Sequence, residues 1–283
     1  MATDSIQSVF HRLERDLVKV CSKRNAENVH RFRGAARRVQ TLLEEVLPEH
    51  GHDHRKLLKT LSRIRKRAGK VRDMDVQLAA LRSLKVPQEP RRKSQLMNGL
   101  IELRAEHEGK LCKVLTKKAV RETRRRLKRA ARDLKPMAAG NALSIARKML
   151  SHAPDPEVRG KLNEDLLHHY RIVGKQARYI AELAPPSAEA TEFIAQLKRM
   201  QDAVGDWHDW FSLTRTAASR LGDIRESTLV AALHNVTGAK FRNAVTALST
   251  MRGTRAALKP ARVARGTSNQ PGKSSHPAAA TAA

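Results

Sequence analysis

Two distant stretches of the chain carry histidine, arginine and lysine in the same order. Residues 29–39 read VHRFRGAARRV, and residues 167–177 read LHHYRIVGKQA. In both, an arginine stands at the third position after a histidine, and a second cation stands at the seventh. Arginine and lysine donate charge-assisted hydrogen bonds to phosphate oxygens, and histidine adds charge below its ordinary pKa of about 6.5. The shared order therefore predicts two matching halves of one anion-binding site.

Helical spacing places the basic residues of each stretch on one face. At 100° per residue, His30, Arg33 and Arg37 fall within an arc of about 60°, beside an apolar stripe. The second stretch repeats this arc with a further arginine beside it, and its basic residues are His168, Arg171, Lys175 and Arg178. An ordinary solvated helix needs charge but no particular order of charges. We therefore favour a polyanion site over two solvated faces.

The elements that carry these residues are predicted to be helices. Apolar residues recur at spacings of three and four along most of the chain, and the alternation typical of strands is missing. The fold class is therefore predicted to be all-α. A second pair of similar segments follows the first pair, at residues 61–75 and 197–211. Arg65 and Arg72 lie at the edge of the apolar stripe of the earlier segment, where we expect them to reach the same site.

The internal repeat also predicts the domain organisation. Two copies of a helix, a loop and a longer helix indicate two sequence-related helical bundles packed about a pseudo-twofold axis. We place the first bundle at residues 1–136 and the second at 139–258, an arrangement in which the two basic faces can line one shared groove or channel. Residues 259–283 are rich in Pro, Ser, Ala and basic residues and have little to bury, so we expect a disordered tail.

The composition points to a polyanionic partner. The 283 residues include 56 Lys and Arg against 28 Asp and Glu, which gives a formal net charge of +28. Nucleic acid, an anionic membrane surface and a phosphate polymer all carry the opposite charge. Aromatic residues make up only 3%, which offers few rings on which single-stranded bases stack.

The sequence gives no indication of export or of a membrane span. The N-terminal residues carry charges every few positions, and no apolar run approaches the roughly 18 residues of a membrane helix. Cys21 and Cys112 lack the spacing of a metal or disulfide framework and are expected to be reduced thiols. We therefore expect a cytoplasmic protein.

The paired motifs give a specific resemblance. VHRFRGAARRV with AGKVRDMDV, then LHHYRIVGKQARYIAEL with VGDWHDW, resemble the CHAD family, the conserved histidine α-helical domain. The resemblance implies two four-helix bundles with a basic central pore that binds inorganic polyphosphate. Carried over by position, it marks His30, Arg33, Arg37, His168, Arg171, Lys175 and Arg178.

The chain also departs from the family pattern. Gln40 and Gln176 stand where basic residues are often found, and His208 stands where the first copy has Arg72. Some phosphate subsites are therefore expected to be weaker in this chain. The family is often joined to a catalytic CYTH domain, and no stretch of this sequence resembles one, so we expect a stand-alone module.

Two other segments suggest competing sites. EHGHDH, residues 49–54, places His50, His52 and His54 at alternate positions, which suits zinc or nickel if further ligands join them. No further ligand pattern completes the set, so we favour a solvated loop. The run RETRRRLKRAARDLK, residues 121–135, could bind nucleic acid, but we favour the fourth helix of the first bundle, because no known DNA-binding motif accompanies it.

An enzymatic site would need a nucleophile with its base or paired carboxylates. The nearest carboxylate pairs are Asp73 with Asp75 and Asp206 with Asp209, and ion pairing is the simpler role for them. Our leading hypothesis is therefore non-catalytic binding of polyphosphate, without cofactor or metal, with targeting to polyphosphate granules as one use. Binding of nucleic acid or association with the nucleoid is the second hypothesis, and a metal-dependent phosphohydrolase is the third.

Overall fold

The computed structural model describes residues 2–46, 51–86, 88–134, 141–153, 163–222 and 227–257. These residues form nine helices and no strand, which confirms the predicted all-α class. No helix among them is long and apolar enough to cross a membrane. The segment 259–283, predicted to be a disordered tail, lies outside the described residues, and so does His50.

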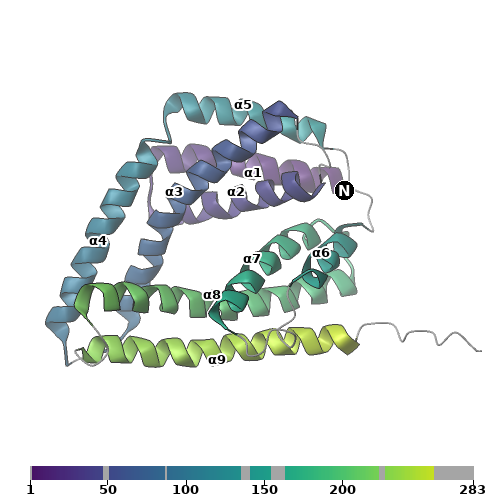
Figure 1. Cartoon of the computed structure of the whole chain (residues 1–283). Coiled ribbons are helices and arrows are strands. Elements are labelled where there is room, and N and C mark those ends of the chain that lie inside the picture. Colours follow the sequence, from purple (N-terminus) through teal and green to yellow (C-terminus); the bar gives the residue numbers. More distant parts are fainter. Residues whose placement is uncertain are drawn as a thin grey trace, which may run out of the picture.

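The first half of the chain contains five of these helices. They are α1 (Ala2–Ser22), α2 (Ala26–Val46), α3 (His52–Ser83), α4 (Pro90–Cys112) and α5 (Lys117–Asp133). Helices α1, α2, α5 and the first part of α3 pack together around apolar side chains such as Leu13, Phe32 and Leu61. Helix α4 runs beside the second part of α3 instead (Figure 1).

The second half contains the other four. They are α6 (Asn141–Ser151), α7 (Glu164–Ala181), α8 (Ala188–Leu221) and α9 (Thr228–Ala257). Helix α6 packs on α7, α7 packs on α8, and α8 and α9 form a long antiparallel hairpin (Figure 1). The side-chain oxygens of Asn163 and Ser187 accept hydrogen bonds from the first turns of α7 and α8, which fixes where these two helices begin.

The two halves meet through helices that are equivalent in the repeat. Helix α2 contacts α7, and α3 contacts α8. Twofold symmetry brings equivalent surfaces together in this way, so these contacts support the predicted pseudo-twofold relation. The exact bundles and the central pore stay predictions, and the predicted boundary falls between α5 and α6, partly outside the described residues.

Two apolar cores join the halves. The larger core takes side chains from both halves and includes Trp207, which is 2% exposed. The second core lies at the far ends of the two long hairpins. It consists of Met74, Leu78 and Leu81 of α3, Leu96 and Leu100 of α4, Leu213 and Ala217 of α8, and Leu229, Val230 and Leu233 of α9, with Val86 beside them. Trp210 packs against this second core, so both tryptophans contribute to packing.

A polar cluster fixes α4 against the rest of the first half. The guanidinium of Arg104 donates to Asp75 Oδ1 at 2.7 Å and to the backbone carbonyl of Arg24 at 2.8 Å, and it also pairs with Glu108. The Asp75 side chain is only 7% exposed, so its charge depends on this one partner among the described residues.

We predict that Arg104→Met lowers the free energy of unfolding by about 2 kcal/mol, because the Asp75 carboxylate is left buried without its cation. Urea denaturation of the variant and the wild type measures the change. Lys110→Met, which removes an exposed ion pair with Glu106 on the same helix, serves as the control and should change stability little. Equal stability of the Arg104 variant and the wild type would contradict the role given to this cluster.

Candidate functional site

Seven of the nine predicted site residues line one cavity of about 180 Å³, here called the central cavity. It lies where α2 meets α7 and α3 meets α8. The basic residues on its wall are His30, Arg33 and Arg37 of α2, Arg65 and Arg72 of α3, and Arg171 and Lys175 of α7. The repeated order of cations along the sequence therefore corresponds to a convergence of both halves in space.

The other two predicted residues lie elsewhere. His168 lines a neighbouring cavity of about 740 Å³, here called the adjacent cavity, and its ring stacks on that of His208 with 5.5 Å between centroids. Arg178 does not line the central cavity. Its guanidinium pairs with Glu182 at 3.2 Å and lies over the Tyr179 ring. The sequence could have indicated this pairing, because Glu182 follows Arg178 by four residues and so lies on the same side of the helix.

Neighbouring side chains hold the arginines of the central cavity in place. Arg33 Nη1 lies 3.6 Å from Asp73 Oδ1, and its guanidinium crosses Gly69, where a Cβ would stand 3.6 Å from Nη2. Arg65 Nε donates a 2.6 Å hydrogen bond to Gln40 Oε1. Gln40 is 6% exposed, so the residue that departs from the family pattern orients a cation of the site.

Burial and mutual repulsion lower the pKa values of several cations in the central cavity. Burial, with Arg171 and Arg37 close by, lowers the pKa of Lys175 from 10.5 to about 7. Burial also lowers the pKa of Arg33, Arg65 and Arg171, and nearby cations act in the same direction. The pKa of His30 is lowered by burial and by Arg72. Because like charges are held together in a site of reduced dielectric, an anion in the cavity would relieve their repulsion.

Two carboxylates share the wall with these cations. Asp73 and its counterpart in the repeat, Asp209, both line the central cavity. Asp73 pairs with Arg33, and Asp209 Oδ1 lies 3.6 Å from His208 Nδ1. Asp75 pairs instead with Arg104, and Asp206 pairs with Lys240 at 2.8 Å. In each carboxylate pair that the sequence suggested for catalysis, one member therefore lines the central cavity and the other forms an ion pair elsewhere.

Comparison with known proteins identifies the family. The sequence matches the family profile described as "CHAD domain" over residues 5–218. The chain belongs to the CHAD domain family. This match confirms the resemblance that the paired histidine and arginine motifs predicted.

Solved structures show the same fold. The chain is similar to the CHAD domain from the plant Ricinus communis, with 19% identity, 90% of each chain covered and a TM-score of 0.67. It is also similar to PptA from Streptomyces chartreusis, with 14% identity, a TM-score of 0.64, and coverage of 90% of this chain and 98% of that one. A comparison with curated proteins found no match.

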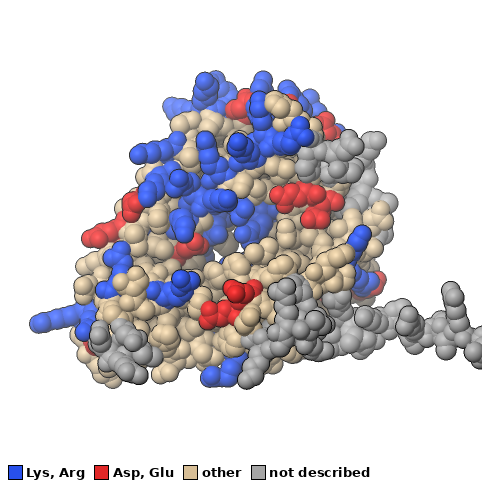
Figure 2. All heavy atoms as spheres, in the orientation of Figure 1, with Lys and Arg blue, Asp and Glu red and all other residues tan. Residues whose placement is uncertain are grey.

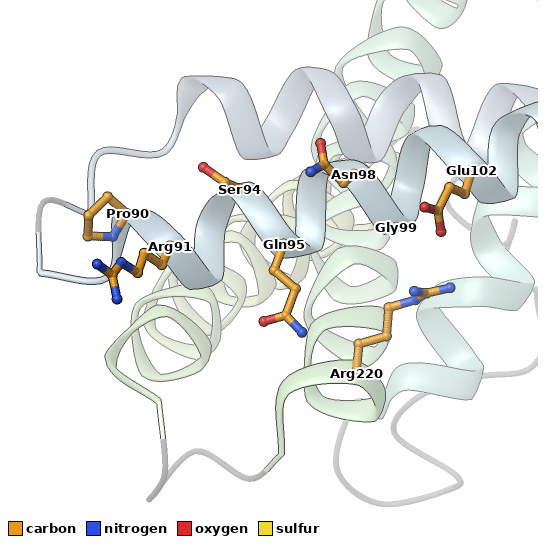
Figure 3. A pocket seen from close by; sticks show the side chains of 8 residues that line it. All are labelled: Pro90, Arg91, Ser94, Gln95, Asn98, Gly99, Glu102 and Arg220. Atoms are coloured by element: carbon orange, nitrogen blue, oxygen red, sulfur yellow. The ribbon is translucent and has the colours of Figure 1, made fainter.

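A further polar cavity lies at the edge of this CHAD domain, between α4 and the end of α8. Its volume is about 710 Å³, and Arg91, Glu102 and Arg220 are among its lining residues. Arg220 extends from the end of α8 toward α4, where Gly99 leaves room for its guanidinium (Figure 3). Two arginines and one acidic side chain line this cavity, so its excess of positive charge is smaller than that of the central cavity.

The competing segments occupy the outside of the first half. Residues 52–54 form the first turn of α3 and not the predicted solvated loop, because His54 Nε2 lies 3.0 Å from Asp133 Oδ2 of α5 and Asp53 pairs with Arg129 of the same helix. No group of three His, Cys, Asp or Glu able to hold a metal ion occurs in the described part of the chain. The basic face of α5 is exposed, and it includes Arg121, Arg124, Arg125, Lys128 and Arg132.

We predict that Arg171→Gln raises the pKa of Lys175 above about 7, because a cation that opposes its protonation is removed, and that Asp209→Asn lowers it. The pKa is measured by NMR titration of ¹³C-methylated lysine side chains. The signal of Lys175 is assigned by its loss in Lys175→Arg. A Lys175 signal that titrates as an ordinary lysine in the wild type would contradict the electrostatics described for this cavity.

Proposed function

We propose that this CHAD domain binds inorganic polyphosphate in the central cavity and performs no chemistry on it. The observation that carries the proposal is the convergence of seven basic side chains from both halves on one cavity of about 180 Å³. Membership of the CHAD family supports the same conclusion. We infer further that binding takes place in the cytoplasm and can recruit the protein to polyphosphate granules.

The donor set suits a flexible phosphate chain. Polyphosphate presents about one negative charge per phosphate and has no base edges, so the protein needs closely spaced donors rather than a sequence-reading surface. A guanidinium group can donate two parallel hydrogen bonds to phosphate oxygens, and a lysine adds a point charge. Arg37 and Arg171 bring such groups into the cavity from opposite halves.

The shape of the site favours polyphosphate over duplex nucleic acid. Proteins read duplex DNA by inserting an exposed helix or ribbon into a groove about 12 Å wide. The cations of the central cavity line a concave space, and the Arg33 side chain is only 27% exposed. The exposed basic face of α5 favours nucleic acid as the second candidate, because its arginines and lysine stand on a convex outer surface.

We predict that replacing Arg37 and Arg171 together by Ala lowers the affinity for polyphosphate on the order of 100-fold, because two charge-assisted phosphate contacts are lost. Isothermal titration of long-chain polyphosphate, duplex DNA and RNA, at equal phosphate concentration and the same salt, measures the effect. Arg121→Ala with Arg125→Ala on α5 removes the same charge and is the control.

The control variant should keep most of its affinity for polyphosphate. Equal affinities of the wild type for the three polymers, with equal dependence on salt, would leave only general charge attraction and would contradict the proposal. A larger loss in the α5 variant than in the cavity variant would place the site on α5.

We predict that the affinity for polyphosphate falls as the pH rises from about 6 to about 8. Lys175 has a pKa of about 7 in the free protein and must be protonated to hold phosphate, so binding takes up protons in this range. His30 and His168, whose pKa values are lowered, add charge only at still lower pH.

Titration calorimetry in buffers of different ionisation enthalpy measures the proton uptake directly. Lys175→Arg keeps the charge at every pH and should remove most of the uptake near neutrality. An unchanged pH profile in this variant would show that Lys175 does not carry the effect.

A further inference from the structure

The outer face of α3 carries a row of exposed cations that the central cavity does not use. Lys56, Lys59, Arg63, Lys66 and Lys70 follow one another at spacings of three and four, so they form one stripe along the helix. The stripe, here called the α3 tract, spans about 21 Å at 1.5 Å per residue. None of its five side chains forms an ion pair with any other described residue.

The same face of the equivalent helix carries the opposite charge. The repeat aligns the α3 tract with five residues of α8, which are Glu192, Ala195, Arg199, Asp202 and Asp206. Arg199, the one cation among these five residues, pairs with Glu192, and Asp206 pairs with Lys240 of α9. The apolar positions beside both stripes are retained, as in Leu61 and Leu197. Folding of the repeat therefore does not require the cations of the α3 tract.

The α3 tract leads toward the proposed site. Its last residue, Lys70, lines the adjacent cavity together with His168 and Asp73. Asp73 also lines the central cavity, so the two cavities share a wall at this point of α3. Lys and Arg gather over α5 and the first part of α3 and continue toward the middle of the face shown in Figure 2, whereas few lie over α8 and α9.

We propose that the α3 tract is a second binding site, which holds the part of a long polyphosphate chain that extends out of the central cavity. This inference rests on the proposed function. The central cavity binds a short segment, and the tract binds the next phosphates at high effective concentration because they are tethered to the first. Only chains long enough to reach from the cavity to the tract gain affinity from it.

The chemistry of the α3 tract favours polyphosphate over RNA. Its five cations form a single narrow row, which matches one flexible line of phosphates. The tract itself contains no aromatic side chain, and the positions between its cations, such as Thr60 and Ser62, do not supply one. Single-stranded nucleic acid is held by base stacking in addition to charge, and this surface offers no ring for stacking.

The asymmetry of the repeat also gives the bound chain a direction. The basic stripe exists on α3 and its counterpart on α8 does not, so a chain that leaves the central cavity is attracted along one side of the molecule only. The exposed carboxylate of Asp202 on α8 repels it from the other side.

The test replaces three residues of the tract by the residues that α8 has at the same positions: Lys56→Glu, Lys59→Ala and Lys66→Asp. Lys70 is kept because it lines the adjacent cavity. The control on α5 makes the same change in charge at exposed positions: Arg121→Glu, Lys117→Ala and Arg132→Asp. Binding of long-chain polyphosphate, tripolyphosphate and RNA is measured for both variants and the wild type over a range of salt concentrations.

We expect the tract variant to bind long-chain polyphosphate at least about 10-fold more weakly, with a shallower dependence of affinity on salt, because fewer counterions are released. Tripolyphosphate should bind the tract variant and the wild type alike, since it is too short to leave the central cavity. The α5 variant should bind both polyphosphates with nearly unchanged affinity.

Several outcomes would overturn the inference. They are an equal loss in the α5 variant, an equal loss for tripolyphosphate, no loss for the long chain, and a loss confined to RNA. Circular dichroism checks that each variant folds, and Lys56→Ala with Lys66→Ala is the milder replacement if the first variant does not. A different result would contradict the proposed function itself. That result is unchanged binding of tripolyphosphate when Arg37 and Arg171 are replaced by Ala.

Discussion

The mutual repulsion of the basic side chains in the central cavity is the constraint on which the rest of this structure depends. Two halves of the chain bring arginines and a lysine to the same small space, and burial makes their repulsion stronger than it would be in water. The fold offsets this cost in three ways. Asp73 and Asp209 supply negative charge, Gln40 accepts a hydrogen bond from Arg65, and apolar cores on both sides hold the helices together.

The periodicity of the sequence predicted the all-α class and the basic faces of α2 and α7 well, because both follow from spacing along a single helix. His30, Arg33 and Arg37 share an arc for the same reason that Arg171 and Lys175 do. The structure places these five in one cavity, together with Arg65 and Arg72 at the edge of the α3 stripe.

What spacing along one helix could not supply was the partner of each side chain. Arg178 stands in the same arc as Lys175 but pairs with Glu182, and His168 lines the adjacent cavity and stacks on His208. From the sequence, Gln40 replaces a basic residue and was expected to weaken the site. In the structure it orients Arg65 across the interface between α2 and α3. Such pairings depend on which helix lies opposite, and this is a tertiary property that a helical wheel does not contain.

The second apolar core begins where the charged cavity ends. Met74 directly follows Asp73 along α3, and Leu213 stands one helical turn beyond Asp209 on α8. Apolar side chains this close carry no polar group that screens the charges beside them, and the electrostatic attraction between a guanidinium and an anion increases as the local dielectric falls. The second apolar core therefore strengthens the ionic contacts nearest to it, such as that of Arg33 with Asp73, although none of its own side chains carries a charge.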